Sequence, residues 1–223
     1  MIKLVDELDS KANMLAGYAK NPRECRNLID RCKSQLLECT CTESMIELLK
    51  NYHDAIGKLE VDKTREPLKI AIIGEIYSII EPYCNLYIEN KLMDYGVSSH
   101  RTLTPSWWVK DAVLSPLKLN SVAIRKASMD YLPLYIGGHA RECIGEAVLA
   151  DLEGYDGVIQ IFPMGCMPEI VAKSILPSIS KEKDLPIMTL VVDEMTGEAG
   201  YVTRIEAFID LLERRKKDVL SRC

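Results

Sequence analysis

Short strand-like runs alternate with helical patterns along the chain after residue 67. Four runs are largely apolar, 68–73, 131–136, 157–162 and 186–192, and a fifth at 97–102 follows a helix closed by Gly96. The helical patterns lie at 84–95, 144–152, 168–176 and 200–217. Apolar strands alternating with amphipathic helices are typical of a parallel sheet covered on both faces. The sequence therefore predicts an α/β fold, a doubly wound parallel sheet (Rossmann-like) preceded by an N-terminal helical segment.

The first 60 residues have a different pattern. Apolar residues recur every three or four positions, with Pro22 as the single proline, which predicts helices. A polar stretch at 61–67 separates this region from the first strand. We therefore divide the chain of 223 residues into an N-terminal helical segment, 1–62, and an α/β domain, 67–223.

Charge and hydropathy exclude several classes of protein. The 28 Lys and Arg stand against 33 Asp and Glu, so the formal net charge is −5, and the basic run at 214–217 complements the end of the last helix. This balance argues against nucleic acid as a partner. No run approaches the roughly 20 apolar residues of a membrane-spanning helix. The charged N-terminus lacks the apolar stretch of a signal peptide, so we expect a cytoplasmic protein.

Eight cysteines are unusual for such a chain. In a reducing compartment they are interpreted as metal ligands, redox groups or small buried hydrophobes before disulfides. Cys25, Cys32 and Cys39 are seven residues apart and share one helical stripe with leucines, which favours packing. The alternative is a metal role for Cys32, Cys39 and Cys41, although the spacing disfavours zinc. Cys41 and Cys223 have no assigned role.

Three further cysteines lie where an α/β sheet places its chemistry. Cys84 follows the first predicted strand, Cys143 the third, and Cys166 lies between the fourth strand and a helix that Pro168 would begin. Ligands of parallel sheets bind beyond the carboxyl ends of the strands, and helix N-termini favour thiolates. If the three thiols converge, they could hold an iron–sulfur cubane and leave one iron open to another ligand. The alternative is that they are small buried residues in tight turns.

Three other side chains are candidates for tuning such a site. His139 and Arg141 stand beside Cys143 and could donate hydrogen bonds to an anionic cluster or substrate. Glu75 follows the first strand and could contribute charge, but an acid in this position is more often a helix cap. The pair 107–108, two tryptophans in a predicted loop, could cover a pocket or pack at a domain seam.

Several motifs together resemble the proteins related to 2-hydroxyacyl-CoA dehydratases and their activators. The resemblance covers about residues 67–215, and its most specific parts are the Gly-Cys-Met-Pro motif at 165–168 and the helix Thr-Arg-Ile-Glu-Ala-Phe at 203–208. The other matching segments are 72–77, 81–85, 155–158, 162–169 and 193–200.

The resemblance implies an oxygen-sensitive iron–sulfur protein. By that likeness Cys84, Cys143 and Cys166 are the ligands of a 4Fe-4S cluster, or of half of an 8Fe-9S double cubane. The family takes low-potential electrons from an ATP-dependent activator that carries its own 4Fe-4S cluster. The electrons serve either removal of water from a 2-hydroxyacyl-CoA or reduction of a small molecule, so the chain would be a reductase or a dehydratase-like component.

The chain departs from this family in having one such domain where a complete dehydratase core or double-cubane chain has two. This departure argues against dehydratase activity of the single chain, and we expect a homodimer that brings two sites together. A non-catalytic binding or assembly subunit, docking a partner through its helical segment, is the alternative. A corrinoid-binding module is disfavoured, because the Asp-x-His-x-x-Gly segment of a cobalt-ligating loop is missing from the sequence.

Overall fold

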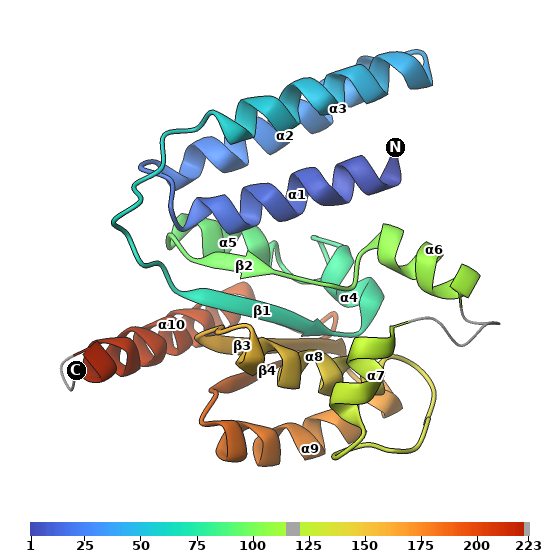
Figure 1. Ribbon diagram of the computed structural model, residues 1–223, viewed down its shortest axis with the longest axis vertical. Helices are drawn as coiled ribbons and strands as arrows, with labels where there is room; N and C mark the ends of the chain where they lie inside the picture. Colours follow the sequence, from blue (N-terminus) through green and yellow to red (C-terminus); the bar gives the residue numbers. More distant parts are fainter. Residues whose placement is uncertain (115–120, 221–223) are drawn as a thin grey trace.

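The computed structural model describes residues 1–114 and 121–220 (Figure 1). In chain order its elements are α1 (Ile2–Ala16), α2 (Pro22–Glu38), α3 (Thr42–Gly57), β1 (Lys69–Gly74), α4 (Ile76–Ile80), α5 (Ile88–Asp94), β2 (Ser98–His100), α6 (Pro105–Leu114), α7 (Val122–Ser128), α8 (Ala140–Leu152), β3 (Gly157–Pro163), α9 (Met167–Lys183), β4 (Ile187–Val192) and α10 (Glu198–Leu220).

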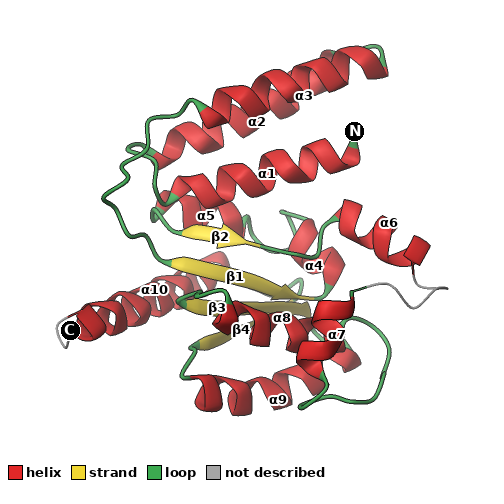
Figure 2. Ribbon diagram, in the orientation of Figure 1, coloured by secondary structure: helices red, strands yellow, loops and turns green. Residues whose placement is uncertain are grey.

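A sheet of four strands in the order β2-β1-β3-β4 forms the centre of the molecule (Figure 2). All neighbouring strands are parallel, with Ile70 opposite Gly157 and Val158 opposite Ile187. The chain moves outward from β1 to β2 and then returns to the other side of β1 for β3. This reversal between β1 and β3 is the switch point of a doubly wound sheet, so the predicted α/β fold is confirmed.

Alternating side chains of β1 enter two separate cores. Ile70 and Ile72 pack with α4, α5 and α10 on one face of the sheet. Ala71 and Ile73 pack with α8 and α9 on the other face. Full burial of an aliphatic side chain contributes about 1.5–3 kcal/mol, so a strand that is apolar on both sides stabilises both layers.

The three N-terminal helices form an additional layer beside the edge strand β2 (Figure 1). The Ser98 hydroxyl donates a hydrogen bond of 2.7 Å to the Met14 carbonyl, which joins β2 to α1. Gly17 allows this approach, because a Cβ there would overlap the Ser98 and Pro67 side chains. Met93 of α5 belongs to the same buried cluster as Ala12. The predicted helical segment is thus confirmed and covers an otherwise open sheet edge.

The structure corrects the predicted elements at three places. The run 131–136 is irregular rather than a strand, since Pro133 offers no amide donor and the side chains of Leu134 and Tyr135 are exposed. The predicted loop around the two tryptophans is instead the helix α6. The helix predicted at 84–95 begins only at Ile88, because Leu86 and Tyr87 take positive φ angles of 52° and 57°.

Candidate functional site

The carboxyl end of β1 is held tightly against β3. Gly74 has a φ of +132°, and a Cβ at this position would overlap the carbonyl oxygen of Ile161. The next amide, that of Glu75, donates to the same carbonyl over 3.0 Å. Only glycine allows this approach without strain, and it places Glu75 directly at the switch point between β1 and β3.

Glu75 is the N-cap of α4. Its carboxylate accepts hydrogen bonds from the amides of Tyr77 and Ser78 at 3.1 and 2.9 Å, and from the Ser78 hydroxyl at 2.9 Å. The interpretation as a helix cap is therefore confirmed. Burial raises the pKa of Cys166 and of Glu169, and the Glu75 carboxylate adds to both effects, so its charge also reaches the segment that follows β3.

Cys166 is the N-cap of α9, with Pro168 in the first turn as expected. Its amide donates to the Pro163 carbonyl at 3.2 Å, which closes the turn after β3. The thiol is partly exposed. Burial raises its pKa, and the nearby amide of Glu169 offsets part of this effect, although no hydrogen bond of normal geometry joins it to the sulfur. The helix N-terminus therefore supports a thiolate here without outweighing desolvation.

Cys84 lies in the turns between α4 and α5, beyond the end of β1, and is also partly exposed. It approaches Tyr77, whose pKa is raised chiefly by the Cys84 sulfur and next by Glu81. Cys84 and Cys166 thus follow the two strands that meet at the switch point, and both thiols are reachable from solvent.

Cys143 has a different environment. The helix α8 begins at Ala140, so Cys143 lies in its first turn, with its amide donating to the His139 carbonyl at 2.8 Å. The thiol is fully buried, and its pKa is well above the usual value because of burial and the neighbouring Glu169. The irregular segment before α8 means that Cys143 does not follow a strand.

A chain of polar side chains runs from the sheet to Glu169, which lies beside Cys143. Thr189 of β4 donates to the Gln160 amide oxygen at 3.0 Å, and the Gln160 amide nitrogen donates to Glu169 Oε2 at 3.0 Å. Glu169 is fully buried, its Oε1 has no hydrogen-bond partner, and burial raises its pKa to about 7. Sequence reasoning missed this chain, although a glutamine within the apolar run 157–162 is a signal that could have found it.

The three predicted ligands lie at one end of the sheet but do not form a common site. Cys143 and Cys166 each lie near Glu169, and Cys84 lies near Tyr77. Across residues 1–114 and 121–220, no three Cys, His, Asp or Glu side chains are grouped closely enough to hold a metal ion. Cys143 faces Glu169 within the core. Cys84 and Cys166, in contrast, are partly exposed and accessible to a ligand.

His139 and Arg141 contact aromatic and acidic side chains. The His139 ring makes an edge contact with Trp107, with 6.3 Å between ring centroids. The Arg141 guanidinium lies 5.1 Å above the centre of the Tyr135 ring and 3.8 Å from the Glu142 carboxylate. These side chains line a cavity of about 420 Å³ that also includes Trp108. Their predicted role near a cluster has no support from these contacts.

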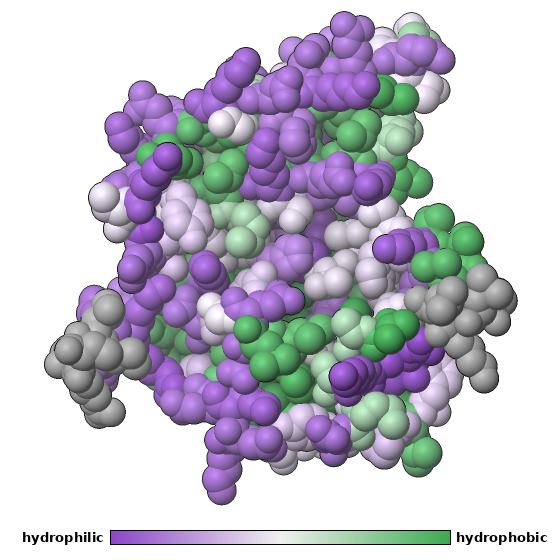
Figure 3. Space-filling view, in the orientation of Figure 1, coloured by the Kyte–Doolittle hydropathy of each residue, from purple (hydrophilic) through white to green (hydrophobic). Residues whose placement is uncertain are grey.

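Exposed apolar side chains surround the two accessible thiols. Tyr77 and Tyr83 flank Cys84, Met164 and Met167 flank Cys166, and Met195 follows β4, and all five are more than half exposed. Hydrophobic side chains also gather on the surface of α6 and over α8 (Figure 3). An apolar surface of this kind is typical of an interaction site. We call the surface formed by Tyr77, Tyr83, Met164, Met167 and Met195 the apolar rim.

The predicted packing of the N-terminal cysteines is confirmed for two of the three and is wrong for Cys39. Cys25 and Cys32 are buried in the core of the helical segment, which confirms packing for these two. Cys39 at the end of α2 is partly exposed. Cys41 is exposed, its thiol donates to the Ser44 hydroxyl oxygen at 3.4 Å, and the proximity of Ser44 lowers its pKa. Cys223 lies outside the described residues.

Comparisons with known proteins add no assignment. No protein-family profile matches this chain, and no curated protein matches it significantly. Within residues 1–114 and 121–220, none of the helices has the length and apolar character needed to span a bilayer. The functional interpretation therefore depends on the fold, the thiols and the sequence resemblance.

Proposed function

We propose that this chain is an iron–sulfur protein related to the 2-hydroxyacyl-CoA dehydratases, which takes low-potential electrons from an ATP-dependent activator. The observation that carries the proposal is the position of Cys84 and Cys166. They are accessible thiols beyond adjacent parallel strands, on the two sides of the switch point. Ligands of doubly wound sheets bind at this point. Such a role requires free thiols, as in a reducing cytoplasm, and all seven cysteines of the described part are free.

Cys143 is the least supported ligand in this proposal. The resemblance makes it the third thiolate, but its burial against Glu169 separates it from the accessible pair. The chemistry that a bound 4Fe-4S cluster supplies is one-electron transfer, with an open iron as Lewis acid where only three thiolates bind. In this chain the Glu75 carboxylate would repel the negative charge of such a cluster, because it already disfavours the Cys166 thiolate.

Iron and sulfide counting on anaerobically purified and reconstituted protein tests the proposal. We expect iron in the unmodified chain and its loss in Cys84→Ala and Cys166→Ala, with Cys143→Ala measured separately. Cys41→Ala is the matched control, since this thiol is exposed but lies in the helical segment. A reconstituted chain without iron would overturn the proposal.

The apolar rim favours a second subunit over this end of the sheet. We propose a homodimer, because a two-fold axis through the rim would bring two sets of accessible thiols together. Sedimentation should show a dimer that Met164→Arg dissociates, while Leu37→Arg on the exposed face of α2 leaves it intact. A monomeric unmodified protein would contradict the dimer.

A non-catalytic binding or assembly subunit is the second candidate. The observation in its favour is that the three thiols do not form a common site, although the apolar rim is present. In that case Cys166→Ala would leave binding to the activator intact and would not change the rate of electron transfer. A loss of electron transfer in this variant would reject this candidate.

A further inference from the structure

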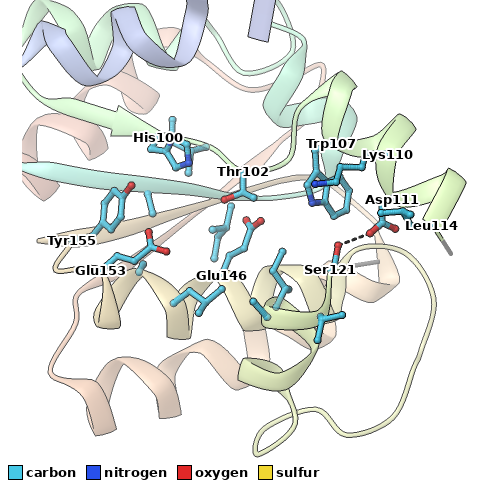
Figure 4. Close-up of a pocket in the computed structure, with 18 residues that line it drawn as sticks. His100, Thr102, Trp107, Lys110, Asp111, Leu114, Ser121, Glu146, Glu153 and Tyr155 are labelled. Atoms are coloured by element: carbon cyan, nitrogen blue, oxygen red, sulfur yellow. Dashed lines mark hydrogen bonds between the residues drawn. The ribbon is translucent and has the colours of Figure 1, made fainter. Parts of the chain in front are cut away.

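A second cavity lies away from the cysteines, on the face of the sheet covered by α8. It has a volume of about 450 Å³, and its walls come from β1, the segment after β2, α6, α7 and α8 (Figure 4). Its apolar floor includes Ala71 and Ile73 of β1. A concave, mostly apolar space with a few polar groups is typical of a small-molecule site.

A stripe of four residues, three from α8 and the fourth its C-cap, lines one wall of this cavity. Glu146, Leu149, Ala150 and Glu153 are spaced i, i+3, i+4 and i+7, so they share one face of the helix. Figure 4 shows both carboxylates directed from α8 toward β1. The stripe therefore presents an acid, an apolar stretch and a second acid in a line.

Glu146 is the polar group of this stripe that lacks a partner. The residue is only 5% exposed, and neither of its carboxylate oxygens has a hydrogen-bond partner. Thr102 lies close enough to favour the charged form, but no hydrogen bond of normal geometry joins them. Burial raises the pKa of Glu146 to about 8. An ammonium ion beside it would supply the missing partner and stabilise the carboxylate.

The other end of the stripe is suited to a second cation. Glu153 is exposed at the end of α8, and its charge adds to the burial that raises the pKa of Tyr155. His100 faces the same end and has a pKa lowered by burial, so its ring brings no competing positive charge at neutral pH. Lys110 lies at the opposite end of the cavity, beside Trp107 (Figure 4).

We propose that this cavity binds a linear aliphatic diamine, with one ammonium group on Glu146, the other on Glu153, and the methylene chain on Leu149 and Ala150. Seven residues of helix correspond to about 10.5 Å along the axis. With each ammonium about 2.8 Å from its carboxylate, a diamine of roughly three methylene groups spans this length in a straight line, and one of up to about five spans it when the carboxylates approach the ammonium groups from the side. This inference is independent of the proposed iron–sulfur function, because it needs neither iron nor the cysteines.

Calorimetric titration of the full chain with 1,5-diaminopentane, at an ionic strength of about 0.15 M to screen non-specific attraction, tests the proposal. We expect one site per chain. Glu146→Gln and Glu153→Gln should each weaken binding roughly tenfold or more, since each removes one charge-assisted hydrogen bond. Glu47→Gln, on the exposed face of α3, is the matched control and should bind normally.

Two further ligands distinguish the contribution of charge to binding from the contribution of shape. 1-Aminopentane should bind roughly tenfold or more weakly than the diamine, and 1-pentanol more weakly still. Equal binding of the diamine and 1-pentanol, or binding unchanged in Glu153→Gln, would overturn the proposal. Because Glu153 is exposed, its substitution leaves the fold intact and the test remains decisive even if Glu146→Gln fails to fold.

Discussion

Glu75 combines a structural and an electrostatic role at the switch point. Three hydrogen bonds fix its carboxylate on the first turn of α4, and its charge disfavours ionisation of Cys166 and Glu169. A side chain fixed in this way keeps its charge in one place. Any anion that binds between β1 and β3 therefore meets a fixed negative group.

Removing the Glu75 carboxylate should destabilise the protein moderately. Glu75→Ala leaves the amides of Tyr77 and Ser78 without their acceptor, and the loss of an N-cap costs about 1 kcal/mol. Urea unfolding measures the change. Glu75→Asp keeps a carboxylate that can cap and should retain most of the stability. An unchanged free energy of unfolding in Glu75→Ala would show that the cap contributes nothing.

The buried acids on α8 and α9 make stability dependent on pH. Burial raises the pKa of Glu146 to about 8 and of Glu169 to about 7, from an ordinary value of 4.5. Between the ordinary pKa and the raised pKa of each acid, the native state binds more protons than the unfolded chain. The contribution of the two acids to the free energy of unfolding is therefore complete at low pH and is lost as the pH rises through their native pKa values.

Glu146→Gln should reduce this pH dependence. The variant cannot ionise at position 146, so its free energy of unfolding should rise relative to the unmodified protein between about pH 5 and about pH 9. The relative gain should exceed about 1 kcal/mol. Urea unfolding across this range measures it, with the exposed Glu47→Gln as control. Parallel pH profiles for the two variants would contradict the burial of an unpartnered acid at this position.

At the scale of elements, the contact between β1 and β3 depends on one glycine. A Cβ at position 74 would overlap the Ile161 carbonyl oxygen, and the φ of +132° is unfavourable for other residues. The end of β1 carries the switch point, so a displacement here would also move Glu75. The close contact therefore couples strand packing to the geometry of the candidate site.

Gly74→Ala should destabilise the protein by about 3 kcal/mol or more, through backbone strain and displacement of β3. Gly197→Ala is the matched control, since no atom lies within 4 Å of the corresponding Cβ position. Thermal unfolding of both variants measures the difference. Similar midpoints for the two variants would mean that β1 and β3 relax around the added methyl group.

At the scale of the whole molecule, the helical segment and the sheet share contacts that a pair of independent domains would lack. Arg101, just after β2, donates to the Ile79 carbonyl at 2.8 Å and pairs with Glu89 at 3.3 Å and with Asp9 of α1 at 4.0 Å. α1 also packs along β2. The two predicted domains are therefore joined by a partly buried ionic cluster and a covered strand edge.

We expect this joined structure to unfold in one transition. Trp107 and Trp108 in α6 report on the sheet unit by fluorescence, whereas circular dichroism is dominated by the helices. The two urea curves should coincide. Arg101→Met should shift both curves together, by about 2 kcal/mol or more, because it leaves Glu89 without its cation. Two separated transitions would instead support independently folding domains.

Hydrophobic periodicity determined the class of fold, the helical N-terminal segment and the packing of Cys25 and Cys32, and an acid directly after a strand indicated the cap at Glu75. These features depend on residues close in sequence, whose pattern records which face of an element is buried. The same reasoning failed at 131–136, where one proline prevents strand pairing in a run that is otherwise strand-like.

Only the tertiary structure decided which side chains meet. Sequence position brought Cys84, Cys143 and Cys166 to one end of the sheet, but rotation of α8 turns Cys143 inward to Glu169 and leaves the other two accessible. The same rotation turns Glu146 and Glu153 toward β1. The direction of a helix face depends on how the helix packs against residues far away in the sequence, and no local pattern in the chain contains that information.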